Sequence, residues 1–582
     1  MGEFGTVRRG QLISTYGVGA LIAIDNNSGM VAGLHRWRVE EEPPLYEPRL
    51  QHVLSVRKFI APPAKKPRSK PWEIDRNVPV VRFPTMYWCP ECRRLDKYYR
   101  LTNELDGKCN LCEKPLVPSR FIVACDHGHI DDFPYMEWVH DGETPKGNHS
   151  LTVRTAGVSV SLADFEIVCS CGKSRSMEEV FSPKAFKGWL WCSGRRPWIG
   201  DYERDCRQVP RTLQRGASNV YFPVMASSIS IPPWSEPAQK YVERHWLAFR
   251  AIPKEAIVPT LMGMEAEKET GISVQEIFQI IMERREGRVQ LATSEEDLRR
   301  QEYTALRNGR PEVSKDQDFV CVEAEGQGEV QDIFGQVMVV TRLREVRVLR
   351  GFTRLRPPEA GESGRIAPLS PGGEDWLPGI EVVGEGVFFK LNEDALRQWE
   401  DGNEALQRRI ELLNANYIRR CRALAISPGR EITARFVLLH TLAHVLIDQW
   451  ALDSGYPAGS LRERLYSSEG DGDEPMAGIL IYTAASDSAG SLGGVVSRAA
   501  KNRLRASILE AYNRAQWCSS DPLCIESEGR GVDSLNLAAC HACCLLPETS
   551  CEHQNILLDR ALIVGTPDEP EVGFLRRIFG GT

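Results

Sequence analysis

Short apolar runs separated by turn residues dominate the first part of the chain. Between residues 1 and about 60, runs such as GALIAI and MVAGL alternate with turn residues. This pattern is typical of strands. Residues 236–310 have a helical pattern instead, and Ser294 begins a capping-box motif (SEED) at the start of one helix. Residues 335–356 begin apolar and then alternate, which predicts strands.

The last third of the chain predicts an apolar core. Asn392 is the expected N-cap of a long helix, because Glu393 and Asp394 follow it. The segment 432–452 is apolar almost all round and therefore predicts a buried helix. The run AGILIY at 477–482 predicts a short core strand, and a glycine-bearing loop then leads into a helix beginning near Val495.

Composition is that of an ordinary globular protein. Hydrophobic residues make up 42% of the 582 residues, and charged residues make up 26%. No run approaches the roughly 20 apolar residues of a membrane span, and the first residues lack the apolar core of a secretory signal. We therefore expect a cytoplasmic protein without membrane contact, in which thiols stay reduced. The 17 cysteines then favour metal binding over disulfide formation.

The clearest metal pattern consists of two C-x-x-C knuckles. They are CPEC and CNLC, and they contribute Cys89, Cys92, Cys109 and Cys112. Two thiolates on one tight turn can span one edge of a zinc tetrahedron, and the second turn supplies the opposite edge. A thioredoxin-like redox site is excluded, because there are two knuckles and no βαβ pattern. The spacing predicts a four-cysteine zinc ribbon.

A looser group of cysteines follows the ribbon. We expect a second zinc bound by Cys169, Cys171, Cys192 and Cys206. Cys125, His127 or His129 could replace one of these ligands. The alternative interpretation is a set of buried thiols that pack as small apolar groups.

Six further cysteines crowd the C-terminal region, two more than one zinc ion needs. Cys540 and Cys543 form one knuckle, and Cys524 and Cys551 could each add a thiolate. Cys544 adjoins Cys543 and would point elsewhere, so we assign it to packing. The three groups together predict two to three zinc ions per chain.

Several phrases of this sequence resemble a known family. The segment CHACCLLPETSCEHQNILLDRAL and the upstream DPLC resemble the MrfA-like zinc-binding domain, which commonly accompanies DNA helicases. Further phrases, including RRGQLISTYGVGAL, ACDHGHIDDFPYMEW and AGILIYTAASDSAGSLGG, follow the order of the DrmB family of the bacterial DISARM anti-phage system. The resemblance spans most of the chain.

The resemblance implies a partner, a task and a set of ligands. The partner is a DrmA-type superfamily 2 helicase, in a heterodimer or larger complex, and the pair engages phage DNA. The implied zinc ligands are Cys524, Cys540, Cys543 and Cys551, with Cys518 as an alternative to one of them. The family is not known to us as catalytic, so the resemblance implies a non-enzymatic subunit.

An enzymatic alternative centres on HTLAHVLID. His440, His444 and Asp448 share one helix face there, and Asp487 could complete a zinc-dependent nucleic-acid hydrolase. The motif lacks the general-base Glu of H-E-x-x-H proteases, because Thr441 occupies that position. No G-K-[ST] follows SDSAGSLGG, which excludes a nucleotide-hydrolysing P-loop. We therefore interpret the two histidines as core residues of a non-enzyme.

Candidate DNA contacts are local, because the net charge is −7. A Pro-rich loop carries Lys65, Lys66, Arg68 and Lys70, which we expect to contact phosphates. Arginines recur between 342 and 356, and again at Arg498 and Arg505, where a solvated face or a contact with an acidic partner is the favoured interpretation.

The expected fold class is α+β and multidomain, with zinc-ribbon elements in the N-terminal half and a mixed α/β zinc-binding module at the C-terminal end. The expected segments are a β-rich region with the basic loop at 1–85, the ribbon at 86–120, a second cysteine-rich region at 121–235, a helical and β region at 236–390, and the zinc-binding domain at 391–582.

Overall fold

The structure is a computed structural model of the 582-residue chain. It describes residues 5–24, 27–40, 42–64, 77–103, 107–155, 161–288, 291–314, 317–358, 364–372, 374–424, 426–470, 474–483 and 494–580. The basic loop with Lys65, Lys66, Arg68 and Lys70 lies outside the described residues, and so does Asp487.

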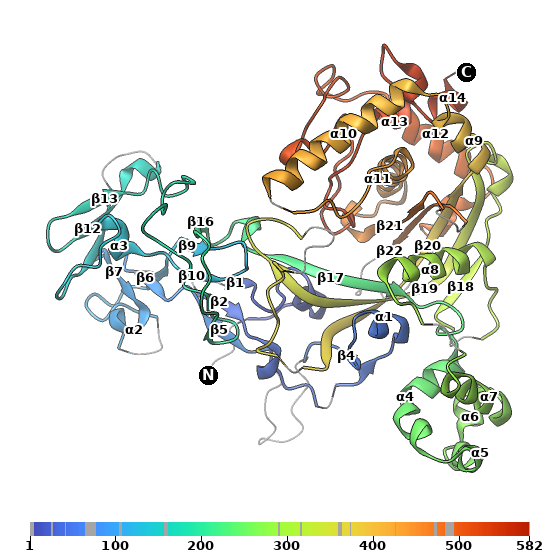
Figure 1. Ribbon diagram of the computed structural model, residues 1–582, viewed down its shortest axis with the longest axis horizontal. Helices are drawn as coiled ribbons and strands as arrows, with labels where there is room; N and C mark the ends of the chain where they lie inside the picture. Colours follow the sequence, from blue (N-terminus) through green and yellow to red (C-terminus); the bar gives the residue numbers. More distant parts are fainter. Residues whose placement is uncertain are drawn as a thin grey trace. The chain divides into compact units, whose positions relative to one another are not determined.

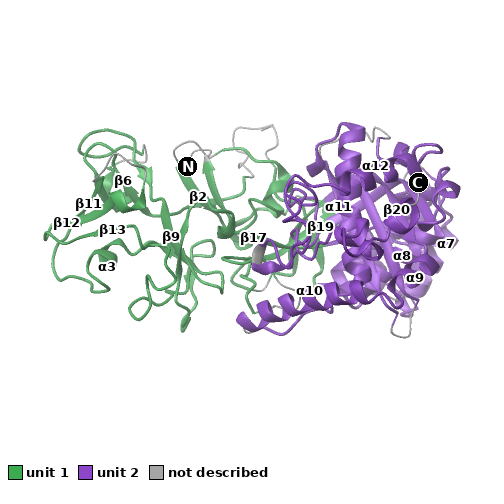
Figure 2. Cartoon of the chain, turned by 90° about the horizontal axis from the view of Figure 1, so that it is seen from above, with its two compact units in different colours: residues 1–45, 56–226, 347–380 green, residues 46–55, 227–346, 381–582 purple. Residues whose placement is uncertain are grey.

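The chain forms two compact units, each assembled from separate segments (Figure 2). Unit 1 comprises 1–45, 56–226 and 347–380, and unit 2 comprises 46–55, 227–346 and 381–582. Strands β17 (Phe222–Ile229), β19 (Phe334–Thr353) and β20 (Trp376–Leu391) each run from one unit into the other. Each unit combines stretches that are far apart in the chain. The division into five consecutive segments expected from the sequence stays a prediction.

Unit 1 consists mainly of short strands (Figure 1). Its elements are β1 (Leu21–Ile24), β2 (Asn27–Val31), β3 (Pro44–Leu45), β4 (Lys58–Ile60), β5 (Val80–Arg82), β6 (Met86–Trp88), β7 (Arg94–Lys97), α2 (Tyr98–Leu101), β8 (Val117–Pro118), β9 (Phe121–Ala124), β10 (Ile130–Asp132), α3 (Tyr135–Val139), β11 (Leu151–Thr155), β12 (Phe165–Cys169), β13 (Ser174–Ser176), β14 (Arg195–Arg196), β15 (Asp201–Tyr202) and β16 (Arg211–Gln214).

Two sheets of unit 1 carry cysteines at their strand ends. One is six-stranded, in the order β13-β12-β11-β7-β6-β8, and the other is three-stranded, in the order β10-β9-β16. In β11, Leu151 and Val153 are buried while Thr152 is less so, because successive side chains of a strand face opposite sides. The buried side packs against Phe133 and Trp138. This core fixes the strand ends on which the cysteines lie.

Unit 2 combines helices with a sheet (Figure 1). Its elements are α1 (Pro48–Val53), α4 (Pro237–Ala251), α5 (Lys254–Gly263), α6 (Ala266–Thr270), α7 (Val274–Arg285), α8 (Glu295–Asn308), β18 (Phe319–Glu323), α9 (Glu393–Glu400), α10 (Glu404–Ala423), α11 (Ala434–Ser454), β21 (Leu461–Ser468), β22 (Met476–Thr483), α12 (Leu504–Ala515), α13 (Ala561–Val564) and α14 (Arg576–Phe579).

Helix α11 is the centre of the unit 2 core. Sixteen of its residues are buried, and it contacts β21, β22, α10, α12 and α13. The hydroxyl of Thr433 caps its first turn by accepting the N–H of Phe436, and Gly455 ends it with a φ of 67°. The buried helix expected at 432–452 and the core strand expected at 477–482 are both confirmed.

Other predicted elements are confirmed with changed boundaries. Ser294 caps α8 by accepting the N–H of Asp297, and Asn392 caps α9. The long helix expected from 392 is two helices, because Gly402 adopts a φ of 66° and Asn403 caps α10. The strands expected within 335–356 form one strand, β19. The α+β fold class is confirmed.

No helix in the described part of the chain is long and apolar enough to cross a membrane.

Candidate metal centres

The ribbon cysteines of unit 1 come together as their spacing predicts. The Sγ atoms of Cys89 and Cys112 are 3.3 Å apart, and those of Cys92 and Cys109 are 3.7 Å apart. A zinc ion with four bonds of about 2.3 Å requires sulfur separations of about 3.8 Å. The four sulfurs therefore fit a zinc tetrahedron.

Each ribbon knuckle is closed by the residue that follows its second cysteine. Arg93 and Glu113 both adopt positive φ, at 61° and 55°, and each donates its backbone N–H to the carbonyl of the first cysteine. The two turns are thus built alike although their sequences differ. The left-handed backbone conformation of Arg93 and of Glu113 closes each turn so that both thiols of the knuckle face the same side.

The second expected zinc site is wrong in its grouping, because the structure divides its cysteines between two sheets. Cys192 and Cys206 lie with Cys125 and His129 at the β9–β10 hairpin. Cys169 and Cys171 lie with His140 and His149 at one end of β11 and β12. His127 is close to the first group, with its Nδ1 atom 3.8 Å from Cys206 Sγ. Its imidazole is not one of the four convergent side chains.

The ring orientation of His129 is that of a metal ligand. Its Nε2 atom is 3.1 Å from the carboxylate of Glu203, which accepts a hydrogen bond from the N–H of that nitrogen. The lone pair of Nδ1 then faces Cys125 Sγ at 3.4 Å and Cys192 Sγ at 3.6 Å. A carboxylate that holds the second nitrogen of a ligating histidine is a recurrent feature of zinc sites.

His140 and His149 show the same arrangement with backbone carbonyls. Nδ1 of His140 donates to the carbonyl of Met136, and its Nε2 is 3.4 Å from Cys171 Sγ. Nε2 of His149 donates to the carbonyl of Lys146, and its Nδ1 is 3.2 Å from Cys169 Sγ. Each ring therefore directs its unprotonated nitrogen toward a sulfur, which suits a His₂Cys₂ zinc site.

The C-terminal group in unit 2 also differs in one ligand. Cys518, Cys524, Cys540 and Cys543 converge, with Sγ separations of 3.5 Å for Cys518–Cys540 and 3.8 Å for Cys524–Cys543. Cys551 lies instead with His440, His444 and Glu463. Cys518, the alternative that the resemblance implies, thus takes the place of Cys551; it follows α12, which packs against α11.

Thiol acidity in these groups reflects crowding of the sulfurs. A hydrogen bond from Cys192 lowers the pKa of Cys125 to about 4, and the same contact raises the pKa of Cys192. A hydrogen bond with Cys543 raises the pKa of Cys524 in the C-terminal group. Neighbouring thiolates repel each other, so only some of these sulfurs ionise by themselves. A divalent cation at the centre would allow all of them to bind it as thiolates.

Arg344 of β19, Arg354 directly after that strand and Arg505 of α12 are each engaged within the fold. Arg354 is fully buried and donates to the carbonyls of Gly128, Val220 and Gly19 within unit 1. Arg344 pairs with Glu381, and Arg505 pairs with Asp332, both within unit 2. These arginines therefore stabilise the fold through contacts within their own unit.

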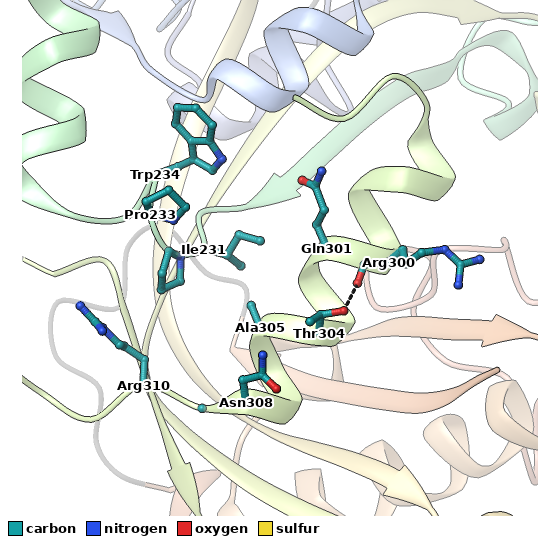
Figure 3. Close-up of a pocket in the computed structure, with 11 residues that line it drawn as sticks. Ile231, Pro233, Trp234, Arg300, Gln301, Thr304, Ala305, Asn308 and Arg310 are labelled. Carbon is teal, nitrogen blue, oxygen red and sulfur yellow. Dashed lines mark hydrogen bonds between the residues drawn. The ribbon is translucent and has the colours of Figure 1, made fainter. Parts of the chain in front are cut away.

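A pocket of about 550 Å³ in unit 2 lies between α8 and residues 231–234 (Figure 3). Trp234 and Ile231 line one side, and Gln301, Thr304 and Asn308 line the other. Its eleven lining residues include no cysteine, histidine or carboxylate. The pocket therefore lacks the groups that general acid–base or metal-assisted hydrolysis needs.

The described residues of the hydrolase alternative do not share one environment. His440 and His444 are fully buried, whereas the Asp448 side chain is half-exposed and pairs with Arg514. Asp487 lies outside the described residues. The described members therefore do not form one solvent-accessible site.

Comparison with known proteins gives two family matches and one near full-length relative. Residues 442–544 match the MrfA Zn-binding domain, and residues 8–222 match a family described as a domain of unknown function (DUF8724). The chain is 31% identical to the DISARM protein DrmB of Bacillus paralicheniformis, over 95% of this chain and 99% of that protein. The zinc cofactor expected from the sequence is supported by the first match and by the convergent cysteines and histidines.

Proposed function

Since the chain belongs to the family of the DISARM protein DrmB, we propose that it is a cytoplasmic, non-catalytic, zinc-stabilised subunit that helps a DrmA-type superfamily 2 helicase engage phage DNA. The observation that carries the proposal is the extent of the match, which includes almost the whole of both chains. A relative that shared only the zinc-binding domain would support metal binding and nothing more.

The metal centres support a scaffolding role for zinc. The proposed ligands in unit 1 are the four ribbon cysteines and the two mixed groups at the β9–β10 hairpin and at β11 and β12, and the proposed ligands in unit 2 are Cys518, Cys524, Cys540 and Cys543. Each group offers four protein ligands, which fill a tetrahedral zinc ion and leave no open position for substrate. Zinc bound in this way stabilises short loops and takes no part in catalysis.

The helicase partner would supply the ATP-driven step that this chain is proposed to lack. The chain would contribute phosphate contacts through the loop with Lys65, Lys66, Arg68 and Lys70. Arg344, Arg354 and Arg505 are engaged within the fold, which supports this loop over those arginines as the source of phosphate contacts.

The test is co-expression of the full chain with a DrmA-type helicase, followed by size-exclusion chromatography and DNA binding. We expect one co-eluting complex that binds DNA more tightly than either protein alone. Separate elution, or equal DNA affinity for the chain alone and the mixture, would contradict the proposal. DNA cleavage by the purified chain that is abolished in His444→Ala would favour the hydrolase instead, provided that it is retained in Asn414→Ala, a change in α10 outside the convergent groups of the described residues.

A further inference from the structure

Four buried side chains of unit 2 converge outside the groups described above. His440 and His444 come from α11, Glu463 comes from β21, and Cys551 comes from the loop after the C-terminal cysteines. The first three are fully buried, and Cys551 is 5% exposed. One potential ligand atom from each lies within 4.8 Å of all the others.

Helix and strand periodicity explain this convergence. His440 and His444 are four residues apart and therefore lie one turn apart on the same face of α11. That face packs on β21, where Glu463 points toward the helix and Arg464 points to the other side of the strand. Glu463 Oε1 is 3.3 Å from His440 Nε2, and Oε2 is 3.6 Å from His444 Nε2.

The proton positions leave acceptors facing each other. Nδ1 of His444 donates to the carbonyl of Cys544 at 2.7 Å, so in the neutral imidazole its Nε2 atom carries a lone pair. That lone pair faces a carboxylate oxygen, and neither atom has a hydrogen-bond partner among the described residues; His440 Nδ1 is a third buried atom without one. Buried polar atoms without partners cost free energy, and two opposed acceptors repel each other as well. A cation between them removes both penalties.

Cys551 is arranged as a metal-bound thiolate would be. Its Sγ atom is 3.3 Å from His440 Nε2 and accepts the backbone N–H groups of His553, at 3.3 Å, and Asn555, at 3.2 Å. Backbone N–H groups that point at a sulfur stabilise negative charge on it. A neutral buried thiol has no need of two such donors.

From this geometry we propose that His440, His444, Glu463 and Cys551 bind a further zinc ion, and that the ion is structural. Two imidazoles, one carboxylate and one thiolate suit zinc, whereas magnesium and calcium require oxygen ligands. The site is closed, because all four ligands come from the protein and all are buried. A catalytic zinc keeps an open position for water or substrate. The two histidines of the hydrolase alternative thus belong to a structural centre.

The site connects α11 and β21 to the C-terminal segment. Cys543 belongs to the four-cysteine group, the next residue accepts the hydrogen bond of His444, and Cys551 belongs to the new site. The segment between Cys543 and Cys551 is therefore held at both ends. The two ions would add to the packing of Cys544 and Leu546 in the unit 2 core.

Metal analysis of matched variants of the full chain tests the proposal. Cys551→Ala should contain one zinc ion fewer per chain than the wild type. Cys421→Ala is the control, since it also removes a buried thiol from the unit 2 core but lies outside the convergent groups of the described residues. It should keep the wild-type zinc content. Equal zinc content in both variants would overturn the proposal.

A measurement on the wild type covers the case in which Cys551→Ala fails to fold. Anomalous diffraction from crystals, recorded above and below the zinc edge, should give a peak between His440, His444, Glu463 and Cys551. Peaks at the other cysteine groups without one here would refute the site. A peak that appears only at the iron or nickel edge would refute the assignment to zinc.

Discussion

Glu302 in α8 and Arg464 in β21 form a fully buried ion pair with two hydrogen bonds, of 2.7 and 2.8 Å. The hydroxyl of Tyr466 and the backbone N–H of Ile229 donate to the same carboxylate. Glu463, one residue before Arg464, faces α11 and its histidines. Strand β21 therefore carries a candidate metal ligand on one side and a satisfied charge pair on the other, which fixes it against both helices.

Removing one partner of this pair should destabilise unit 2 strongly. Arg464→Ala leaves the Glu302 carboxylate buried without its main counter-charge, which costs about 3–5 kcal/mol. We expect a large shift of the urea unfolding transition to lower concentration. Lys268→Ala is the control, because it breaks an exposed pair with Glu265 that contributes at most about 1 kcal/mol. Similar shifts for the two variants would contradict this account of the pair.

The same pair predicts a loss of stability in acid. Burial alone would raise the pKa of Glu302, but Arg464, Arg299 and Arg49 hold it below the ordinary value of 4.5. A carboxyl whose pKa is lower in the folded state stabilises the fold above the unfolded value, and this contribution is lost as pH falls below it. The free energy of unfolding should therefore decrease below about pH 4.5.

Glu302→Gln isolates this contribution. The variant lacks the titrating carboxyl, so its unfolding free energy should change less between pH 5 and pH 3 than that of the wild type. Glu265→Gln is the matched control on the surface and should keep the wild-type pH dependence. A wild-type slope in Glu302→Gln would show that other carboxyls cause the acid loss.

Zinc content should distinguish Cys518, a proposed ligand, from Cys544, which is adjacent in sequence to the proposed ligand Cys543. Cys518→Ser removes a thiolate from the four-cysteine group, so the protein should lose one zinc ion and its C-terminal module should unfold more readily. Cys544→Ser changes a buried cysteine that lies beside Cys543 but outside that group, and should retain zinc. Elemental analysis with thermal unfolding measures both effects. Zinc loss in Cys544→Ser alone would reverse the assignment.

Local patterns were sufficient where the ligands are close in sequence. The ribbon knuckles and the buried helix α11 follow from spacing alone, because each lies within a short segment. The mixed groups could not be found in this way, since strand pairing of β11 with β12 brings His149 to Cys169 across 20 residues. A signal was nevertheless present: ACDHGH places Cys125 and His129 in one short turn.

The assignment of Cys551 required tertiary information of a different kind. Its partners His440 and His444 precede it by more than 100 residues and lie on a helix whose apolar character indicates core packing. Glu463 gives no sign of its role, because a single acidic residue in a strand is ordinary. Only the packing of α11 on β21 brings the carboxylate to the imidazoles, and sequence periodicity does not specify which elements pack together.

The basic loop supplies the last prediction, which rests on the proposed function. Replacing Lys65, Lys66, Arg68 and Lys70 together by glutamine should weaken DNA binding by the complex with the helicase, because phosphate contacts dominate non-specific affinity. If all four contact phosphates, the slope of log affinity against log salt should fall by up to about 3.6. The matched control replaces the exposed Arg250, Lys254, Lys268 and Arg288, which changes net charge equally at α4–α7. Titrations from 50 to 200 mM salt would compare the two. Equal slopes in both variants would place the DNA contacts elsewhere, whereas ATP hydrolysis per bound helicase should be the same in both.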